Sequence, residues 1–188
     1  MNLVTRIAAL PLAALIISAA PAPKDIPLDS YGEALVIPAD SPVRLLRFNK
    51  QHAAASFRGR FVLTGMFVYG CDIECEPPLA KGDVHGSIIP DPDAAARLPH
   101  WKIRNNDMRI YLHGWDRLAA QVVTPDERAA IFAGKVDSIR KHVSIVVDDF
   151  NASIECDSAS YDARFISLAK PPTVAMAMLA GDYGCGWI

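Results

Sequence analysis

The chain has 188 residues and a formal net charge of −2, from 19 basic and 21 acidic side chains. Apolar residues make up 51% of the chain and charged residues 21%, which is typical of a folded protein and excludes a disordered one. A charge this close to zero provides no bulk field for nucleic acid or anionic lipid, so we expect no nucleic-acid partner.

The first residues predict a secretory signal peptide. Met1–Arg6 carries one positive charge, Ile7–Ile17 is apolar and uncharged, and Ser18–Ala20 supplies the small residues that a signal peptidase requires. The apolar run is shorter than the roughly 20 residues that a permanent membrane helix needs. We therefore expect residues 1–20 to be removed, which leaves a secreted or periplasmic chain with no stable membrane anchor.

The rest of the chain divides into residues 21–42, a proline-rich leader, and residues 43–188, a single β-rich domain. Within the leader, Ala34–Ile37 is an apolar stretch between prolines, and it predicts a short edge strand. Arg44–Phe48 predicts a second short strand. The remainder of the leader is expected to be exposed.

Ser56–Cys75 has the strongest alternating pattern in the sequence and predicts one long central strand. Its odd positions from Phe57 to Tyr69 are aromatic, apolar or glycine, whereas its even positions begin basic and become apolar. The aromatic face is therefore expected in the core. Gly59 and Gly65 lie on that face, and glycines within a strand mark bends or close backbone approaches, as when a sheet closes on itself.

Two short helices are predicted from their start signals. In Asp91-Pro92-Asp93, Asp91 is the expected N-cap and Pro92 suits the first turn; Pro99 then ends the helix. Thr124-Pro125-Asp126-Glu127 matches a capping box, so a helix should begin there and end near Gly134. Trp115–Val123 fits either a helix or a strand.

The other strands are predicted by alternation at Asp83–Ile89, Met108–His113, Val143–Val147, Asn151–Cys156 and Tyr161–Leu168. Pro171 and Pro172 separate these from a last apolar segment, Val174–Ala180. A long coiled first strand and a helix before the last strand pairs resemble, in architecture alone, an OB-type barrel. The predicted fold class is mainly β with two short helices, in a small, disulfide-stapled antiparallel barrel.

Four cysteines follow the predicted signal peptide, at Cys71, Cys75, Cys156 and Cys185. In an oxidising compartment they predict two disulfides, although four cysteines allow three pairings. The short spacing favours Cys71–Cys75 with Cys156–Cys185; the alternative joins the end of the central strand to Cys156 or Cys185. A metal site at Cys71, Cys75 and His85 is disfavoured because the sequence has no second cysteine pair at zinc-site spacing.

The sequence does not point to catalytic residues. Ser138–Lys141 matches the S-x-x-K spacing of serine acyl-transferases, but it lies in a β-rich segment and the companion motifs of that class do not occur. The five histidines fall in separate segments. The acids between Asp148 and Asp162 cluster at predicted strand ends, where aspartate is common in turns. We therefore predict no catalytic residue, no cofactor and no metal.

Basic and aromatic side chains in several segments give a candidate ligand face, because they can stack on sugar rings. Its predicted members are Arg58, Arg60, His100, Trp101, Tyr111 and Trp115. The leading functional prediction is a non-catalytic binding or accessory module with a protein or glycan partner. One alternative is a small hydrolase in which the fold brings His100 or His113 to the acids of Asp148–Asp162. The other is a structural envelope protein.

Overall fold

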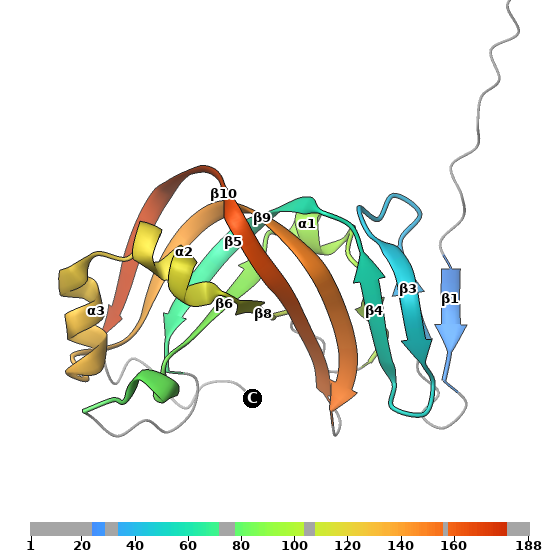
Figure 1. Cartoon of the computed structure of the whole chain (residues 1–188), viewed down its shortest axis with the longest axis horizontal. Coiled ribbons are helices and arrows are strands. Elements are labelled where there is room, and N and C mark those ends of the chain that lie inside the picture. Colours follow the sequence, from blue (N-terminus) through green and yellow to red (C-terminus); the bar gives the residue numbers. More distant parts are fainter. Residues whose placement is uncertain (1–23, 29–33, 72–77, 104–107, 156–157, 180–188) are drawn as a thin grey trace, which may run out of the picture.

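The computed structural model describes residues 24–28, 34–71, 78–103, 108–155 and 158–179. These residues form a mainly β structure with an arched sheet (Figure 1). The strands are β1 (Lys24–Pro27), β2 (Ala34–Ile37), β3 (Arg44–Asn49), β4 (Ala54–Arg58), β5 (Phe61–Gly70), β6 (His85–Pro90), β7 (His100–Trp101), β8 (Ile110–His113), β9 (Val136–Glu155) and β10 (Ser158–Leu179). The helices are α1 (Pro92–Ala95), α2 (Trp115–Val122) and α3 (Pro125–Phe132), with a 3-10 turn, η1, at Lys81–Asp83.

The large sheet has seven strands in the order β10-β8-β6-β5-β9-β4-β3, and β10 also pairs with β9. Neighbouring strands in this sheet are antiparallel, except for β8 and β10, which are parallel to each other. The predicted barrel is wrong, because this sheet is arched but is not a closed barrel. The pairings from β10 through β8, β6, β5 and β9 return to β10, but β6 and β8 share only two residue pairs, and β4 and β3 lie outside this set of strands, beyond β9.

The predicted central strand is two strands that meet at a corner. The chain turns at Gly59, whose φ of +152° suits glycine, and a Cβ there would lie 2.8 Å from the Pro42 carbonyl oxygen. As a result β4 and β5 pair with different parts of β9: Ala55 lies opposite Ala152, and Phe61 lies opposite Val147. The predicted burial of the aromatic face is confirmed from Phe57 to Tyr69.

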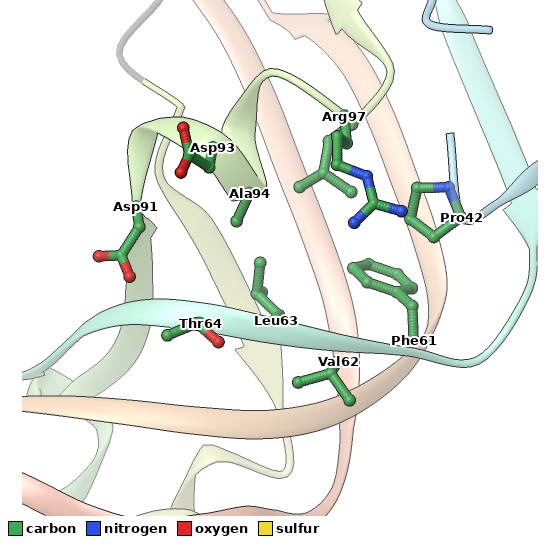
Figure 2. Close-up of a pocket in the computed structure, with 10 residues that line it drawn as sticks. Pro42, Phe61, Val62, Leu63, Thr64, Asp91, Asp93, Ala94 and Arg97 are labelled. Carbon is green, nitrogen blue, oxygen red and sulfur yellow. The ribbon is translucent and has the colours of Figure 1, made fainter. Parts of the chain in front are cut away.

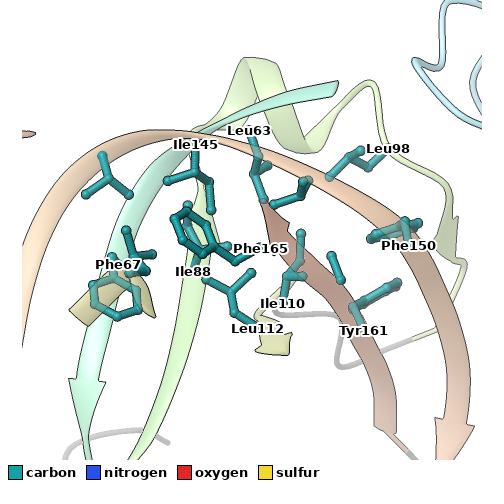
Figure 3. Close-up of a cluster of buried hydrophobic side chains, with 14 of the residues drawn as sticks. Leu63, Phe67, Ile88, Leu98, Ile110, Leu112, Ile145, Phe150, Tyr161 and Phe165 are labelled. Carbon is teal, nitrogen blue, oxygen red and sulfur yellow. The ribbon is translucent and has the colours of Figure 1, made fainter. Parts of the chain in front are cut away.

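The core lies beneath the arch and is built from the inward positions of β5, β6, β8, β9 and β10 (Figure 3). Its largest fully buried side chains include Phe57, Phe67, Trp101, Phe150, Tyr161 and Phe165. Phe150 stacks on Tyr161 with ring centroids 6.1 Å apart. Burial of large aromatic rings is the main source of stability in such a core.

Strands β9 and β10 are longer than the alternation predicted. Two separate strands were expected within β9, but the strand continues through Asp149, which accommodates the irregularity with a φ of +51°. β10 continues through Pro171 and Pro172, which were expected to end the strand. The pairing with β9 shifts register between Lys170 and Val174, so the prolines fall where the ladder is interrupted.

A small second sheet, in the order β1-β2-β7, includes part of the stretch expected to be a leader. The strand predicted at Ala34–Ile37 is confirmed as β2. Leu28 and Leu35 are buried and belong to the main core, so the described part of residues 21–42 packs on the domain. In β7 the Trp101 N–H donates to the Tyr161 hydroxyl at 3.0 Å, which joins the small sheet to β10.

The helix predictions hold for α1 and α3. The capping box of α3 is complete: the Glu127 N–H donates to Thr124 Oγ1 at 3.2 Å, and the Thr124 N–H donates to the Glu127 carboxylate at 2.8 Å. The ambiguous segment at Trp115 is a third helix, α2. In the described part of the chain, none of the helices has the length and apolarity to cross a bilayer.

Candidate functional site

A pocket lies between the start of β5 and the segment that carries α1, and we call it the α1 pocket (Figure 2). Its volume is about 540 Å³. The lining residues are Pro42, Phe61, Val62, Leu63, Thr64, Asp91, Asp93, Ala94, Arg97 and Leu98. A volume of this size falls within the range of roughly 300–1,000 Å³ that is usual for small-molecule sites.

The α1 pocket has an apolar floor and a charged rim. Phe61, Leu63 and Leu98 are buried side chains of the core that reach its surface here. On one side of the rim lie Asp91 and Asp93, and on the other lies Arg97 (Figure 2). The guanidinium of Arg97 is 3.1 Å from a carboxylate oxygen of Asp40, and both side chains are well exposed. Exposed ion pairs of this kind contribute little to stability, so Arg97 can exchange partners easily.

The position of α1 depends on Asp91, although not in the way that the sequence suggested. Asp91 does precede the helix, but its side chain forms no capping hydrogen bond, so that part of the prediction is wrong. Its backbone N–H donates to the Thr64 carbonyl at 3.0 Å, which fixes the helix start against β5. Its carboxylate accepts from His142 Nε2, which lies 3.0 and 3.1 Å from the two oxygens.

A second, smaller cavity lies beside the α1 pocket on the outer face of β9, and we call it the His142 cavity. It has a volume of about 180 Å³ and is lined in part by Thr64, His142, Ser144 and Lys170. Thr64 lies opposite Ser144 in the β5–β9 ladder, and their hydroxyl oxygens are 2.9 Å apart. The two cavities are neighbours because Thr64 lines both.

The side chains around the two cavities include a histidine, an acid and two hydroxyls, which are the components of a hydrolytic site. Within the described residues, however, His142 forms a hydrogen bond only with Asp91, and the hydroxyls of Thr64 and Ser144 bond to each other. Neither hydroxyl is therefore held by a base as a nucleophile would be. The described part of the chain also has no group of three or more His, Cys, Asp or Glu side chains placed to hold a metal ion.

The side chains of the predicted ligand face do not form one surface. Trp101 is fully buried, and His100 Nδ1 lies 3.0 Å from the Leu98 carbonyl. Arg58 and Arg60 are exposed at the corner between β4 and β5, where Arg60 lies 3.7 Å from Asp148. Tyr111 is exposed on β8, while Trp115 lines a different pocket near α2 and α3.

The histidine and acids of the hydrolase alternative are partly brought together. His113 Nε2 lies 3.1 Å from an Asp162 oxygen, which also accepts from Asn151 Nδ2 at 2.8 Å. His113 is largely exposed on the strand surface. Asp148 and Asp149 instead pair with Arg164, at 2.9 and 2.7 Å. These acids form surface ion pairs between strands rather than a pocket.

His142 lies just before the predicted strand Val143–Val147, and sequence reasoning did not place it with Ser144, although residues two apart in a strand share a face. What the sequence could not reveal is that Thr64 and Asp91 lie against them. Comparison with known proteins found no matching family model, no similar curated protein and no similar solved structure.

Proposed function

We propose that this protein is an exported, disulfide-stapled β-domain that binds a small amphipathic ligand without changing it chemically. The α1 pocket is the observation that carries the proposal. It has a volume suited to a small molecule, an apolar floor of core side chains and charges of both signs at its rim. A protein or glycan partner that presents an apolar group beside a charged one would meet the same requirements.

Export is proposed from the pattern of residues 1–20 and from the four cysteines. Cys71 follows β5, and the other three cysteines lie outside the described residues, so their pairing stays a prediction. Peptide mass spectrometry of the exported chain under non-reducing conditions tests it. Four free thiols would contradict the disulfides, and a mature N-terminus before residue 20 would contradict the cleavage.

Ligand binding in the α1 pocket is tested by filling it. Ala94 lines the pocket and is only partly buried, so we expect Ala94→Trp to occupy the space without disturbing the core. Ala96 is exposed on the same segment and does not line the pocket, which makes Ala96→Trp the matched control. The probe is anilinonaphthalenesulfonate, an amphipathic anion whose fluorescence rises in apolar sites.

We expect Ala94→Trp to weaken binding of this dye by about tenfold or more, which is a loss of about 1.4 kcal/mol. Ala96→Trp should bind as the unmodified chain does. Near-UV circular dichroism must show native packing in both variants, because loosened cores also bind the dye. Equal dye affinity in the two variants would contradict the proposal.

A small hydrolase is the second candidate, and the Asp91–His142 pair beside two hydroxyls is the observation that favours it. A hydrolase using this site would cleave an activated ester such as p-nitrophenyl acetate, and both His142→Gln and Ser144→Ala would abolish the cleavage. If the unmodified chain cleaves the ester no faster than either variant, this candidate is excluded.

A further inference from the structure

A third pocket lies at the opposite end of β5 from the α1 pocket, beneath α2 and α3, and we call it the α2–α3 pocket. It has a volume of about 270 Å³. Tyr69, near the end of β5, lines it together with Trp115 of α2 and Phe132 of α3. The volume is at the small end for ligand sites, so it suits one substituted ring rather than an extended chain.

The aromatic walls of this pocket are held in place by the fold. The rings of Trp115 and Tyr69 are tilted by 48° with centroids 5.8 Å apart. Trp115 also lies directly over Gly86 of β6, where a Cβ would collide with it. Because this backbone contact and the Tyr69 ring fix the indole, a flat ligand would meet a preformed surface with little loss of side-chain entropy.

The charges around the pocket are unbalanced. Arg128 and Lys81 both line it, and neither forms an ion pair with any described residue. Asp116 is the single acid among the lining residues. By contrast Glu127, the neighbour of Arg128, is neutralised by Lys141. Two cations and one acid leave the lining with a net positive charge, which attracts an anion.

Tyr69 adds a hydrogen-bonding group to the same pocket. The residue is only 3% exposed, yet its hydroxyl is not among the fully buried unpartnered polar atoms of the described residues, so the hydroxyl is reached from the pocket. Burial raises the pKa of this phenol, against a smaller opposing effect of the Arg128 charge, so it remains a donor at neutral pH. An O–H at the wall of a pocket can donate its hydrogen bond to a bound ligand that has an acceptor oxygen.

We propose that the α2–α3 pocket binds the carboxylate of a small aromatic acid. The carboxylate lies between Arg128 and Lys81 and accepts a hydrogen bond from the Tyr69 hydroxyl, while the ring packs against Trp115 and Phe132. This site is separate from the α1 pocket and does not depend on the function proposed for it.

The test uses benzoate as the probe and benzamide as its uncharged equivalent of the same shape. Amide and indole N–H chemical shifts of the full exported chain are followed during titration with each compound. We expect benzoate to shift the signals of Trp115 and of residues around Arg128, and benzamide to bind at least tenfold more weakly, because charge-assisted hydrogen bonds are much the stronger kind. Equal binding of the two compounds, or shifts located elsewhere, would overturn the proposal.

Three variants measure what Arg128, Lys81 and Tyr69 each contribute to benzoate binding. We expect Arg128→Gln to weaken benzoate binding by about tenfold, and Lys81→Gln, at a more exposed position, by about threefold. Tyr69→Phe removes only the hydroxyl and should cost about threefold. Lys135→Gln removes an exposed cation that does not line the pocket and is the matched control. If Lys135→Gln weakens binding as much as Arg128→Gln does, the effect is one of net charge and the proposed site is wrong.

Discussion

Two neighbouring residues of β9 each pair with an acid from the start of a helix. Lys141 Nζ donates to Glu127 of α3 at 2.7 Å, and His142 Nε2 lies 3.0 Å from Asp91, which precedes α1. Adjacent strand residues point to opposite faces, so one pair faces the core side and the other the outer side. The Lys141 and Glu127 side chains are 8% and 24% exposed, against 35% and 42% for His142 and Asp91.

This difference in burial separates a structural role from a functional one. A buried lysine cannot lose its partner without leaving a charge in a low-dielectric site, so the Lys141–Glu127 pair fixes α3 on the sheet. The His142–Asp91 pair is partly solvated, and breaking it costs little. A pair of low energetic value at the edge of two cavities can be rearranged by a ligand, whereas the buried pair cannot.

The largest expected effect is that of Glu127→Ala. It leaves the Lys141 ammonium buried without a partner and also removes half of the capping box, so we expect the free energy of unfolding to fall by about 3 kcal/mol. Urea denaturation measures this change. Asp126→Ala, at an exposed position in the same turn, should change stability by less than about 0.5 kcal/mol. If the two variants are equally stable, the buried pair does not have the role assigned to it.

Lowering the pH should remove the stabilisation that the Lys141–Glu127 pair provides. Burial by itself would raise the pKa of Glu127, but the hydrogen bonds from Lys141 and Thr124 outweigh it and hold the pKa below its ordinary value. The contribution of the Lys141–Glu127 pair to the free energy of unfolding is therefore complete above the pKa of Glu127 in the unfolded chain, about 4.3. It is lost as the pH falls through the pKa of Glu127 in the folded chain. Urea midpoints should decrease over that acidic range more steeply for the unmodified chain than for Glu127→Gln. Parallel curves for the two proteins would contradict this assignment.

Thr124→Ala separates the cap from the ion pair. It removes the hydroxyl that accepts from the Glu127 N–H but leaves the Lys141–Glu127 contact, so we expect a loss of about 1 kcal/mol. Thr124→Ser keeps the hydroxyl and should stay close to the unmodified stability. The same chemical denaturation experiment measures both. A loss as large as that of Glu127→Ala would mean that the cap, and not the ion pair, holds α3.

The smallest expected effect is that of Asp91→Asn, which removes the charge that faces His142. We expect a change below about 1 kcal/mol, because both side chains are partly exposed. A double-mutant cycle of Asp91→Asn with His142→Gln should give a coupling energy well below that of Glu127→Gln with Lys141→Met. Similar coupling energies in the two cycles would remove the distinction between the pairs.

The local part of this arrangement could be predicted from the sequence. The capping box of α3 involves residues three apart, and the buried face of β5 follows from simple alternation; both are confirmed. Trp115, which was predicted as part of a ligand face, lines the α2–α3 pocket, whereas its predicted companion Trp101 lies in the core. At α3 and β5 the interacting residues are close in the chain, so the pattern within one element was sufficient to predict them.

The candidate site could not be predicted because its contacts are distant in sequence. Asp91 has the residue type and position of an N-cap, but its carboxylate forms a hydrogen bond with His142 of β9 instead of capping the helix. Likewise Gly59 was correctly expected to bend the chain, but the bend separates two strands rather than closing a barrel. Which strand pairs with which depends on packing over the whole sheet, and no local signal specifies it.

The central place of β9 also has a consequence for how this chain reaches its native state. β4 and β5 both depend on β9 for a neighbour, and the paired residues Thr64 and Ser144 are 80 positions apart. During synthesis the apolar faces of β4 and β5 thus stay uncovered until residues 136–155 have been made. Such non-local pairing slows folding and exposes aggregation-prone strands. We therefore expect the chain to complete its main sheet only after residues 136–155 have been made.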